Sequence, residues 1–169
     1  FPKAVALDTM NFWIQNMYNE LLDVIRRIDI LIINEAELRE ISKEHNLVKG
    51  AKKIMSLGPT CIVVKRGEYG VFMMSREEIF LAPAYPLEDV FDPTGAGDTF
   101  AGGFMGYISN IGDTSLKTLK QAIILGSVMA SFNVEDFSIN RIKSLDYMEI
   151  KERYSAFKRC MQFGDLEFK

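Results

Sequence analysis

Residues 92–104 read Asp-Pro-Thr-Gly-Ala-Gly-Asp-Thr-Phe-Ala-Gly-Gly-Phe, and the interpretation of the chain starts from this stretch. Pro93 and Gly95 end any element that arrives from the N-terminal side, whereas the residues from Ala96 onward favour a helix with one apolar stripe. The backbone N–H groups of Gly95, Ala96 and Gly97 then lie at the helix N-terminus, where they have no partner within the helix and the macrodipole is positive. Because these side chains are missing or small, an anion can approach the backbone closely.

Asp98 follows this turn directly, although a carboxylate repels a phosphate rather than binding it. A carboxylate is useful there if a group beside the phosphate must lose a proton, as an alcohol does when it attacks a phosphoryl group. The alternative is an ordinary helix entry, with Asp98 as a first-turn acid that the dipole favours. We rank the catalytic interpretation first because a proline, a threonine, three small residues, an aspartate and a Gly-Gly pair occur together. The chain lacks the G-x-x-x-x-G-K-[ST] motif, and Phe100 stands where the dinucleotide motif needs a third glycine.

The composition of the 169-residue chain is that of an ordinary globular protein, with 48% hydrophobic and 25% charged residues. The formal net charge is −3 and the lysines and arginines are scattered, so we expect no nucleic-acid partner. No apolar run is long enough to span a bilayer and no signal peptide is visible, so we expect no membrane partner. The two cysteines indicate a reducing compartment and hence a cytoplasmic protein.

Apolar runs typical of buried strands alternate with helical patterns, which predicts an α/β fold: a mostly parallel sheet with helices on both faces. The predicted strands are 4–7, 29–33 and 60–64, followed by a short hairpin of 71–74 and 79–82. The predicted helices are 12–28, a short one that opens at Asn34, then 47–57, 96–110, 116–132 and about 145–161. No repeat or linker interrupts residues 1–169, which we therefore treat as a single domain.

In open α/β sheets, ligands bind beyond the carboxyl ends of the strands. Four features fall at predicted strand ends: Asp8, residues 34–37, residues 65–70 and residues 92–98. Because these segments follow separate elements, we expect them to converge at one edge of the sheet. This convergence predicts a functional site there independently of the 92–104 motif.

Two of these segments have alternative interpretations. Asn34 and Glu37, spaced N-x-x-E, are either a helix N-cap with a first-turn acid or an outer-shell site for Mg²⁺, which keeps most of its waters. The residues alone favour the cap, and the two interpretations are compatible. Residues 65–70, Lys-Arg-Gly-Glu-Tyr-Gly, predict a turn with glycines that need a positive φ. The Lys65 ammonium either reaches a phosphate or is solvated.

The 92–104 stretch resembles the C-terminal signature of the ribokinase-like carbohydrate kinases, the phosphofructokinase B family. The resemblance extends over residues 4–137 and covers about half of the usual length of that family. It implies a ribokinase-like three-layer sandwich whose N-terminal part and lid are missing here. Residues 1–169 would then be the C-terminal nucleotide-binding and catalytic portion. The implied activity is ATP-dependent phosphorylation of a hydroxymethyl group of a sugar or related small alcohol.

The resemblance also assigns roles to individual residues. The carboxylate of Asp98 is the general base, and residues 95–97 form the anion hole. Asn34 and Glu37 are linked to Mg²⁺ and phosphate. The residues on the nucleotide side are Lys65, Gly67, Gly70, Thr94 and Asn133. From the residues alone, Asp92 and Thr94 hold the loop through local side-chain-to-backbone bonds, and Asn133 is an ordinary residue at a helix C-terminus.

The missing acceptor half leaves the function of this polypeptide open. The chain has no initiator methionine and enters directly on a strand-like run, so we expect it to begin inside a larger protein. The full-length protein is expected to be a homo-oligomer, and the resemblance leaves open whether a monovalent cation takes part. The alternatives to a sugar kinase are a nucleoside kinase of the same family and a catalytically silent nucleotide-binding fragment or subunit.

Overall fold

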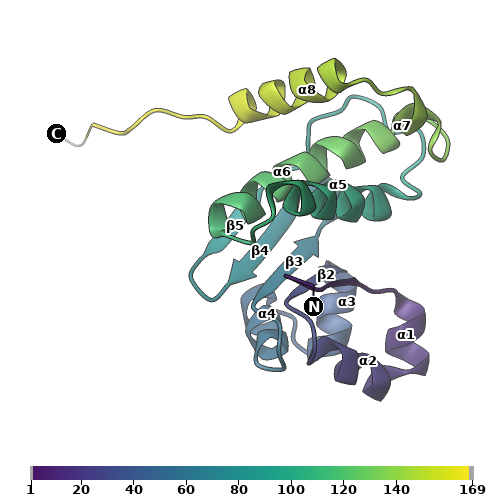
Figure 1. The fold of residues 1–169 in the computed structure, drawn as a ribbon, viewed down its shortest axis with the longest axis vertical. Helices are drawn as coiled ribbons and strands as arrows, with labels where there is room; N and C mark the ends of the chain where they lie inside the picture. Colours follow the sequence, from purple (N-terminus) through teal and green to yellow (C-terminus); the bar gives the residue numbers. More distant parts are fainter. Residues whose placement is uncertain (1, 168–169) are drawn as a thin grey trace.

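A five-stranded sheet forms the centre of the protein in a computed structural model, which describes residues 2–167 (Figure 1). The strands are β1 (Ala6–Asp8), β2 (Ile30–Asn34), β3 (Cys61–Lys65), β4 (Val71–Ser75) and β5 (Ile79–Ala82). They lie in the order of the sequence, and β1, β2 and β3 are parallel. Because β4 is antiparallel to both its neighbours, it alone runs against the other strands. The mostly parallel sheet and the β4–β5 hairpin were both predicted from the sequence and are confirmed.

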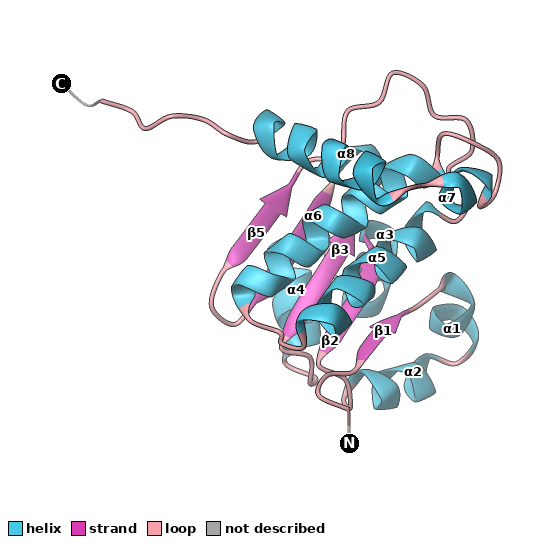
Figure 2. Cartoon of the chain, turned by 45° about the horizontal axis from the view of Figure 1, so that its top comes forward, coloured by secondary structure: helices cyan, strands magenta, loops and turns pink. Residues whose placement is uncertain are grey.

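The helices cover both faces of this sheet. They are α1 (Asn11–Asn16), α2 (Tyr18–Ile25), α3 (Glu35–Ser42), α4 (Leu47–Met55), the 3₁₀ turn η1 (Gly67–Tyr69), α5 (Ala96–Ile111), α6 (Leu116–Asn133), α7 (Asn140–Ser144) and α8 (Tyr147–Cys160). Helices α1 to α4 lie on one face, and α5, α6 and α8 lie on the other (Figures 1 and 2). The layers are therefore helix, sheet and helix, which confirms the three-layer sandwich.

The strand β2 shows why continuous apolar runs form this sheet. Successive side chains of a strand point to opposite faces, so Ile30 and Ile32 join the core under α5, α6 and α8. Leu31 and Ile33 join the core that α1 to α4 cover. Because both faces are covered by helices, each strand position needs an apolar side chain.

Two details of the helices differ from the predictions. The predicted helix 12–28 is broken at Met17, where φ is −140° and ψ is 48°, into α1 and α2. The break allows the Tyr18 hydroxyl to donate to the carbonyl of Ile41 in α3, at 2.8 Å. The short helix α7 was not predicted, because it has no apolar periodicity. It is held instead by Arg141, which pairs with Glu135 and Glu149.

The sheet is open at both ends in the part of the chain that the structure describes. There, β1 pairs only with β2, and β5 pairs only with β4. The helix α1, which follows β1 along the chain, carries exposed apolar side chains: Phe12 is 51% and Trp13 is 44% exposed. In residues 2–167, no helix combines the length and the apolarity that crossing a bilayer requires.

Helices α5 and α6 approach each other closely at glycines. A β-carbon added at Gly126 would lie 2.8 Å from the carbonyl oxygen of Phe100 and 3.0 Å from its ring. One added at Gly103 would lie 3.1 Å from the Cα of Gly126. The contact therefore needs glycine on both helices, and it fixes α6 against the second turn of α5.

We expect Gly126→Ala to lower the free energy of unfolding by about 1–3 kcal/mol, because the added methyl overpacks the helix contact. This loss should exceed the gain from the higher helix propensity of alanine. Urea unfolding measures the difference. The matched control is Gly164→Ala, where an added β-carbon meets nothing within 4 Å. Equal stability of the two variants would contradict the close approach.

Candidate active site at the N-terminus of α5

The turn before α5 depends on the backbone conformation of Gly95. Its φ is 81° and its ψ is −3°, which lies in the left-handed region that glycine adopts without strain. Just before the turn, the carboxylate of Asp92 accepts a hydrogen bond from the amide of Thr94 at 2.9 Å. The backbone and side chain of Thr94 hold the pKa of Asp92 below its ordinary value. The chain thus enters α5 through a fixed local geometry, as the local role predicted for Thr94 requires.

The first turn of α5 leaves backbone donors without partners. The amide of Ala96 donates to the carbonyl of Pro93 at 3.2 Å, so it is not free. Within residues 2–167, the amides of Gly95, Gly97 and Asp98 have no acceptor, as expected where a helix begins. Two of the three predicted anion-hole amides, and that of Asp98 as well, therefore have no acceptor in this part of the chain, and their role as an anion hole stays a prediction.

The side chain of Asp98 lies at the surface of this first turn. Among the described residues it makes no hydrogen bond or ion pair, so its oxygens remain available to a ligand. The arrangement puts a carboxylate directly beside free N–H donors. Chemically, the donors suit a phosphoryl oxygen and the carboxylate suits a hydroxyl proton.

Lys65 joins the ends of two strands to the start of α5. Its Nζ donates to both carboxylate oxygens of Asp8, at 2.9 and 2.8 Å. A β-carbon added at Gly97 would lie only 3.2 Å from the same Nζ. The carboxyl ends of β1 and β3 therefore meet at the N-terminus of α5, which confirms the predicted convergence of these segments.

Asn34 and Glu37 form a reciprocal capping box at the start of α3. The backbone N–H of Asn34 donates to Glu37 Oε2, and the backbone N–H of Glu37 donates to Asn34 Oδ1, both at 2.8 Å. The side chain of Glu37 is only 4% exposed. Burial raises its pKa, against the opposing effects of the Asn34 hydrogen bond and the Lys65 charge. The structure thus bears out the cap, and Mg²⁺ binding by this pair stays a prediction.

The turn at 65–70 needs its two glycines for different reasons. Gly67 has a φ of 57°, and Gly70 has a φ of 83°. A β-carbon at Gly70 would also lie 2.1 Å from the carbonyl oxygen of Ala82, so the backbone after β5 passes too closely for any side chain. The predicted positive φ at both glycines is confirmed, whereas their contact with a nucleotide stays a prediction.

Asn133, at the end of α6, lies under the turn at Gly95 that leads into α5. It is 1% exposed, and both polar atoms of its amide bond to the segment around Gly95. Its expected contact with a nucleotide stays a prediction. The sequence analysis missed Thr99, which donates to Asn133 Oδ1 at 2.6 Å. The available signal was Asn133 itself, a buried amide in the last turn of α6 that needs hydrogen-bond partners.

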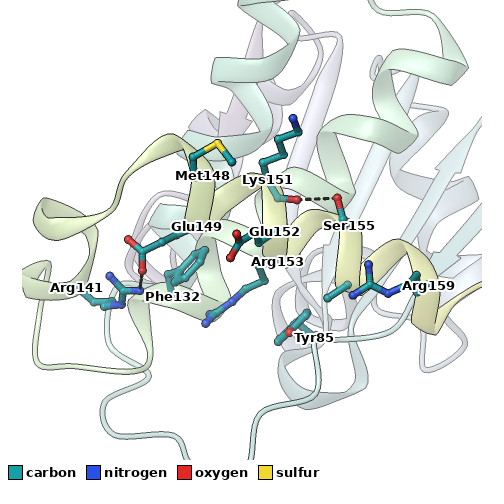
Figure 3. A pocket seen from close by; sticks show the side chains of 11 residues that line it. Tyr85, Phe132, Arg141, Met148, Glu149, Lys151, Glu152, Arg153, Ser155 and Arg159 are labelled. Atoms are coloured by element: carbon teal, nitrogen blue, oxygen red, sulfur yellow. Dashed lines mark hydrogen bonds and ion pairs between the residues drawn. The ribbon is translucent and has the colours of Figure 1, made fainter.

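A cavity of about 570 Å³ lies away from these residues, along α8 (Figure 3). Arg141 and Arg153 line it, and the guanidinium of Arg153 lies 3.5 Å above the ring of Phe132. None of the predicted site residues lines this cavity. The candidate site is instead the open surface at the first turn of α5.

Free amides at a helix N-terminus, beyond the ends of parallel strands, are typical of α/β proteins that bind phosphate groups. Residues 5–143 match the family described as pfkB family carbohydrate kinase, and the chain belongs to this family. The resemblance found in the sequence is thus confirmed.

Named relatives of this chain are kinases. The chain is 37% identical over 87 residues to a cytidine kinase of Thermococcus kodakarensis, which covers 50% of this chain and 31% of the relative. It is 28% identical over 122 residues to a ribokinase of Staphylococcus aureus, covering 69% of this chain and 38% of the relative. The chain therefore spans well under half the length of these relatives.

Solved structures show the same fold. A ribokinase from Thermotoga maritima superimposes with a TM-score of 0.75 at 26% identity, covering 92% of this chain and 50% of that one. An aminoimidazole riboside kinase from Salmonella enterica, complexed with aminoimidazole riboside and an ATP analog, gives a TM-score of 0.77 at 21% identity. That match covers 90% of this chain and 52% of the kinase. The protein thus has the ribokinase-like fold over about half of its usual extent.

The raised pKa of Glu37 predicts a pH dependence of stability. Because the folded state binds this proton more tightly than the unfolded state, the stabilising contribution is fully present below pH 4.5 and is lost as the pH rises through the folded pKa. Glu37→Gln keeps the capping box and removes the titration. We therefore expect the variant to gain stability relative to the wild type as the pH rises above 4.5 and through the folded pKa of Glu37.

Urea unfolding across this pH range, in the presence of a chelator, measures the difference. Glu20→Gln on α2 is the control, because Glu20 is exposed, has no hydrogen-bond partner in the described part of the chain and is not among the groups that shift the pKa of Glu37. A constant difference between the wild type and Glu37→Gln at every pH would contradict a raised pKa.

Proposed function

We propose that the protein of which this chain forms the catalytic portion is an ATP-dependent phosphotransferase. It phosphorylates a hydroxymethyl group of a sugar or related small alcohol, including a nucleoside. The observation that carries the proposal is the exposed carboxylate of Asp98 beside the free amides of Gly95, Gly97 and Asp98 itself. Membership of the pfkB family supports it.

In this proposal, Asp98 accepts the proton of the acceptor hydroxyl while the hydroxyl oxygen attacks the γ-phosphorus of ATP, and the bond from this phosphorus to the β,γ-bridging oxygen breaks to release ADP. The free amides donate to the oxygens of the transferred group, where negative charge develops in the transition state. Positive charge from the α5 macrodipole acts on the same oxygens. A positioned base of this kind contributes about 10²- to 10⁴-fold to the rate.

The nucleotide would lie along the turn at 65–70. The backbone at Gly67 and Gly70 carries no side chains, and the Lys65 ammonium lies next to Gly97. Lys65 is therefore placed to contact a phosphate, with Asp8 holding its orientation. The exposed side chain of Thr94 completes this nucleotide side. The ATP analog named with the Salmonella relative supports ATP as the donor.

Mg²⁺ would be held through water by Glu37, with Asn34 beside it. Among residues 2–167, no three histidine, cysteine, aspartate or glutamate side chains converge as metal ligands, and Mg²⁺ that keeps most of its waters needs no such cluster. Glu37 uses Oε2 to accept from Asn34, which leaves Oε1 for a metal-bound water. When bound, the ion neutralises charge on the phosphate oxygens.

The relatives support this acceptor class. A cytidine kinase and a ribokinase are named among them, and both a nucleoside and a furanose sugar carry a hydroxymethyl group. We also propose that the whole protein is cytoplasmic and forms a homo-oligomer. A second candidate is a nucleotide-binding subunit without turnover of its own, because the chain spans about half of its relatives and β1 has an open edge.

We expect Asp98→Asn to lower kcat by at least about 10²-fold, because asparagine cannot accept the proton. ATP affinity should change little, since the amides stay in place. ATP consumption of the intact protein against a panel of sugars and nucleosides measures kcat, and calorimetry measures affinity. Asp165→Asn in the exposed C-terminal segment is the control. Comparable turnover of Asp98→Asn and the wild type would refute the assignment.

For the metal site, we expect Glu37→Gln to raise the Mg²⁺ concentration needed for half-maximal turnover, because an uncharged amide attracts a hydrated cation less. The Glu20→Gln variant, changed at an exposed position of α2, should keep the wild-type Mg²⁺ dependence. An unchanged Mg²⁺ requirement in Glu37→Gln would leave this residue only its capping role.

A further inference from the structure

Asn133 connects the end of α6 to both sides of the turn at Gly95. Its Nδ2 donates to the carbonyl of Thr94 at 2.9 Å, before the turn. Its Oδ1 accepts from the Thr99 hydroxyl at 2.6 Å, after the turn. The orientation of the amide is fixed by these partners, because a carbonyl can only accept and Nδ2 can only donate.

The bond to Thr94 bears on the amide of Asp98. In an uninterrupted helix, the carbonyl of Thr94 would accept from the amide four residues later, which is that of Asp98. Here this carbonyl accepts from Asn133 instead, and the Asp98 amide has no partner among residues 2–167. Asn133 thus satisfies an acceptor at the helix start and leaves the donor free.

The side chain lies directly against the turn. A β-carbon added at Gly95 would lie 3.6 Å from Asn133 Oδ1 and 3.8 Å from Nδ2. The next residue, Val134, accepts through its carbonyl from the amide of Phe91 at 2.7 Å and from that of Asp92 at 3.3 Å. The end of α6 therefore holds the incoming loop as well as the first turn of α5.

This end of α6 is itself held by α7 and α8. Arg153 donates to Ser131 Oγ at 3.2 Å and pairs with Glu135. Arg141 also pairs with Glu135, at 3.1 Å, and both guanidinium groups lie over the ring of Phe132 (Figure 3). Asn133 consequently donates and accepts from a rigid position.

We propose that Asn133 is the positioning residue of the anion hole, acting through Thr94 and Thr99 rather than by contact with a ligand. Its two hydrogen bonds set the place of the free amides of Gly95, Gly97 and Asp98. The catalytic consequence rests on the proposed function. A displacement of donor groups by about 1 Å can cost about 10²-fold in rate, so a buried amide behind the turn matters for turnover.

The test is a set of variants of the intact protein that change one hydrogen bond each. Thr99→Val keeps the shape and removes the hydroxyl, whereas Thr99→Ser keeps the hydroxyl. Asn133→Asp puts an acceptor against the Thr94 carbonyl. Thr60→Val is the matched control, because its hydroxyl donates to the Asp29 carbonyl at the opposite end of β3.

We expect kcat to fall about 10- to 100-fold in Thr99→Val and Asn133→Asp, with the KM for ATP within about 3-fold of the wild type. Thr99→Ser should recover most of kcat, and Thr60→Val should keep it. Unchanged kcat in both variants would overturn the proposal. A loss confined to the KM for ATP would also overturn it, because Asn133 would then act by contacting the nucleotide.

A second readout does not need turnover. Titration of inorganic phosphate, followed by NMR of the backbone amides, should shift the Gly95, Gly97 and Asp98 signals in the wild type. At the same phosphate concentration, the chemical-shift changes of these three amides should be at least about 3-fold smaller in Thr99→Val. If the wild type lacks kinase activity but this difference is seen, the positioning stands and the proposed function fails. If the wild type is active and Thr99→Val responds identically, the positioning fails and the function stands.

Discussion

The left-handed backbone of Gly95 turns the chain into α5, and among residues 2–167 the amides of Gly95, Gly97 and Asp98 are left without acceptors. Unpaired donors at the positive end of a helix are the physical feature on which the site depends. The surrounding structure holds this turn from three sides. Asp92 fixes the loop before it, Asn133 lies beneath it, and Lys65 lies beside Gly97. The close α5–α6 contact at Gly126 holds the second turn of α5, at Phe100, against α6.

Charge is distributed unevenly around this turn. Lys65 is neutralised by Asp8 on the sheet side, and Glu37 is buried nearby with a raised pKa. Asp98, in contrast, is exposed on the helix side and has no partner in the described part of the chain. The carboxylate of Asp8 therefore pairs with a lysine and that of Glu37 caps a helix, whereas the exposed carboxylate of Asp98 is the one that we propose as the base. Asp8, Glu37 and Asp98 are all ordinary acidic side chains. They differ in this structure only in their burial and in the groups that they contact.

Local patterns in the sequence predicted the strands, the start of α5 and the convergence of the strand ends, because each depends on nearby residues or on a general rule for parallel sheets. Contacts between distant segments were not predictable. The Lys65–Asp8 pair and the Asn133–Thr99 bond join residues that are 57 and 34 positions apart. The motif also did not reveal that the Ala96 amide donates to the Pro93 carbonyl, and the contact of these amides with an anion stays a prediction. The break at Met17 and the helix α7 depend on tertiary partners, namely Ile41, Glu135 and Glu149, and not on periodicity.

The most direct test of this account is a structure of the protein with a non-hydrolysable ATP analogue and Mg²⁺. We expect a terminal phosphate oxygen about 3 Å from the amide nitrogens of Gly97 and Asp98. The Asp98 carboxylate should face the open side of the same phosphate. Phosphates bound instead in the cavity lined by Arg141 and Arg153 would contradict the central claim, as would a nucleotide whose phosphates leave the amides of the Gly95 turn untouched.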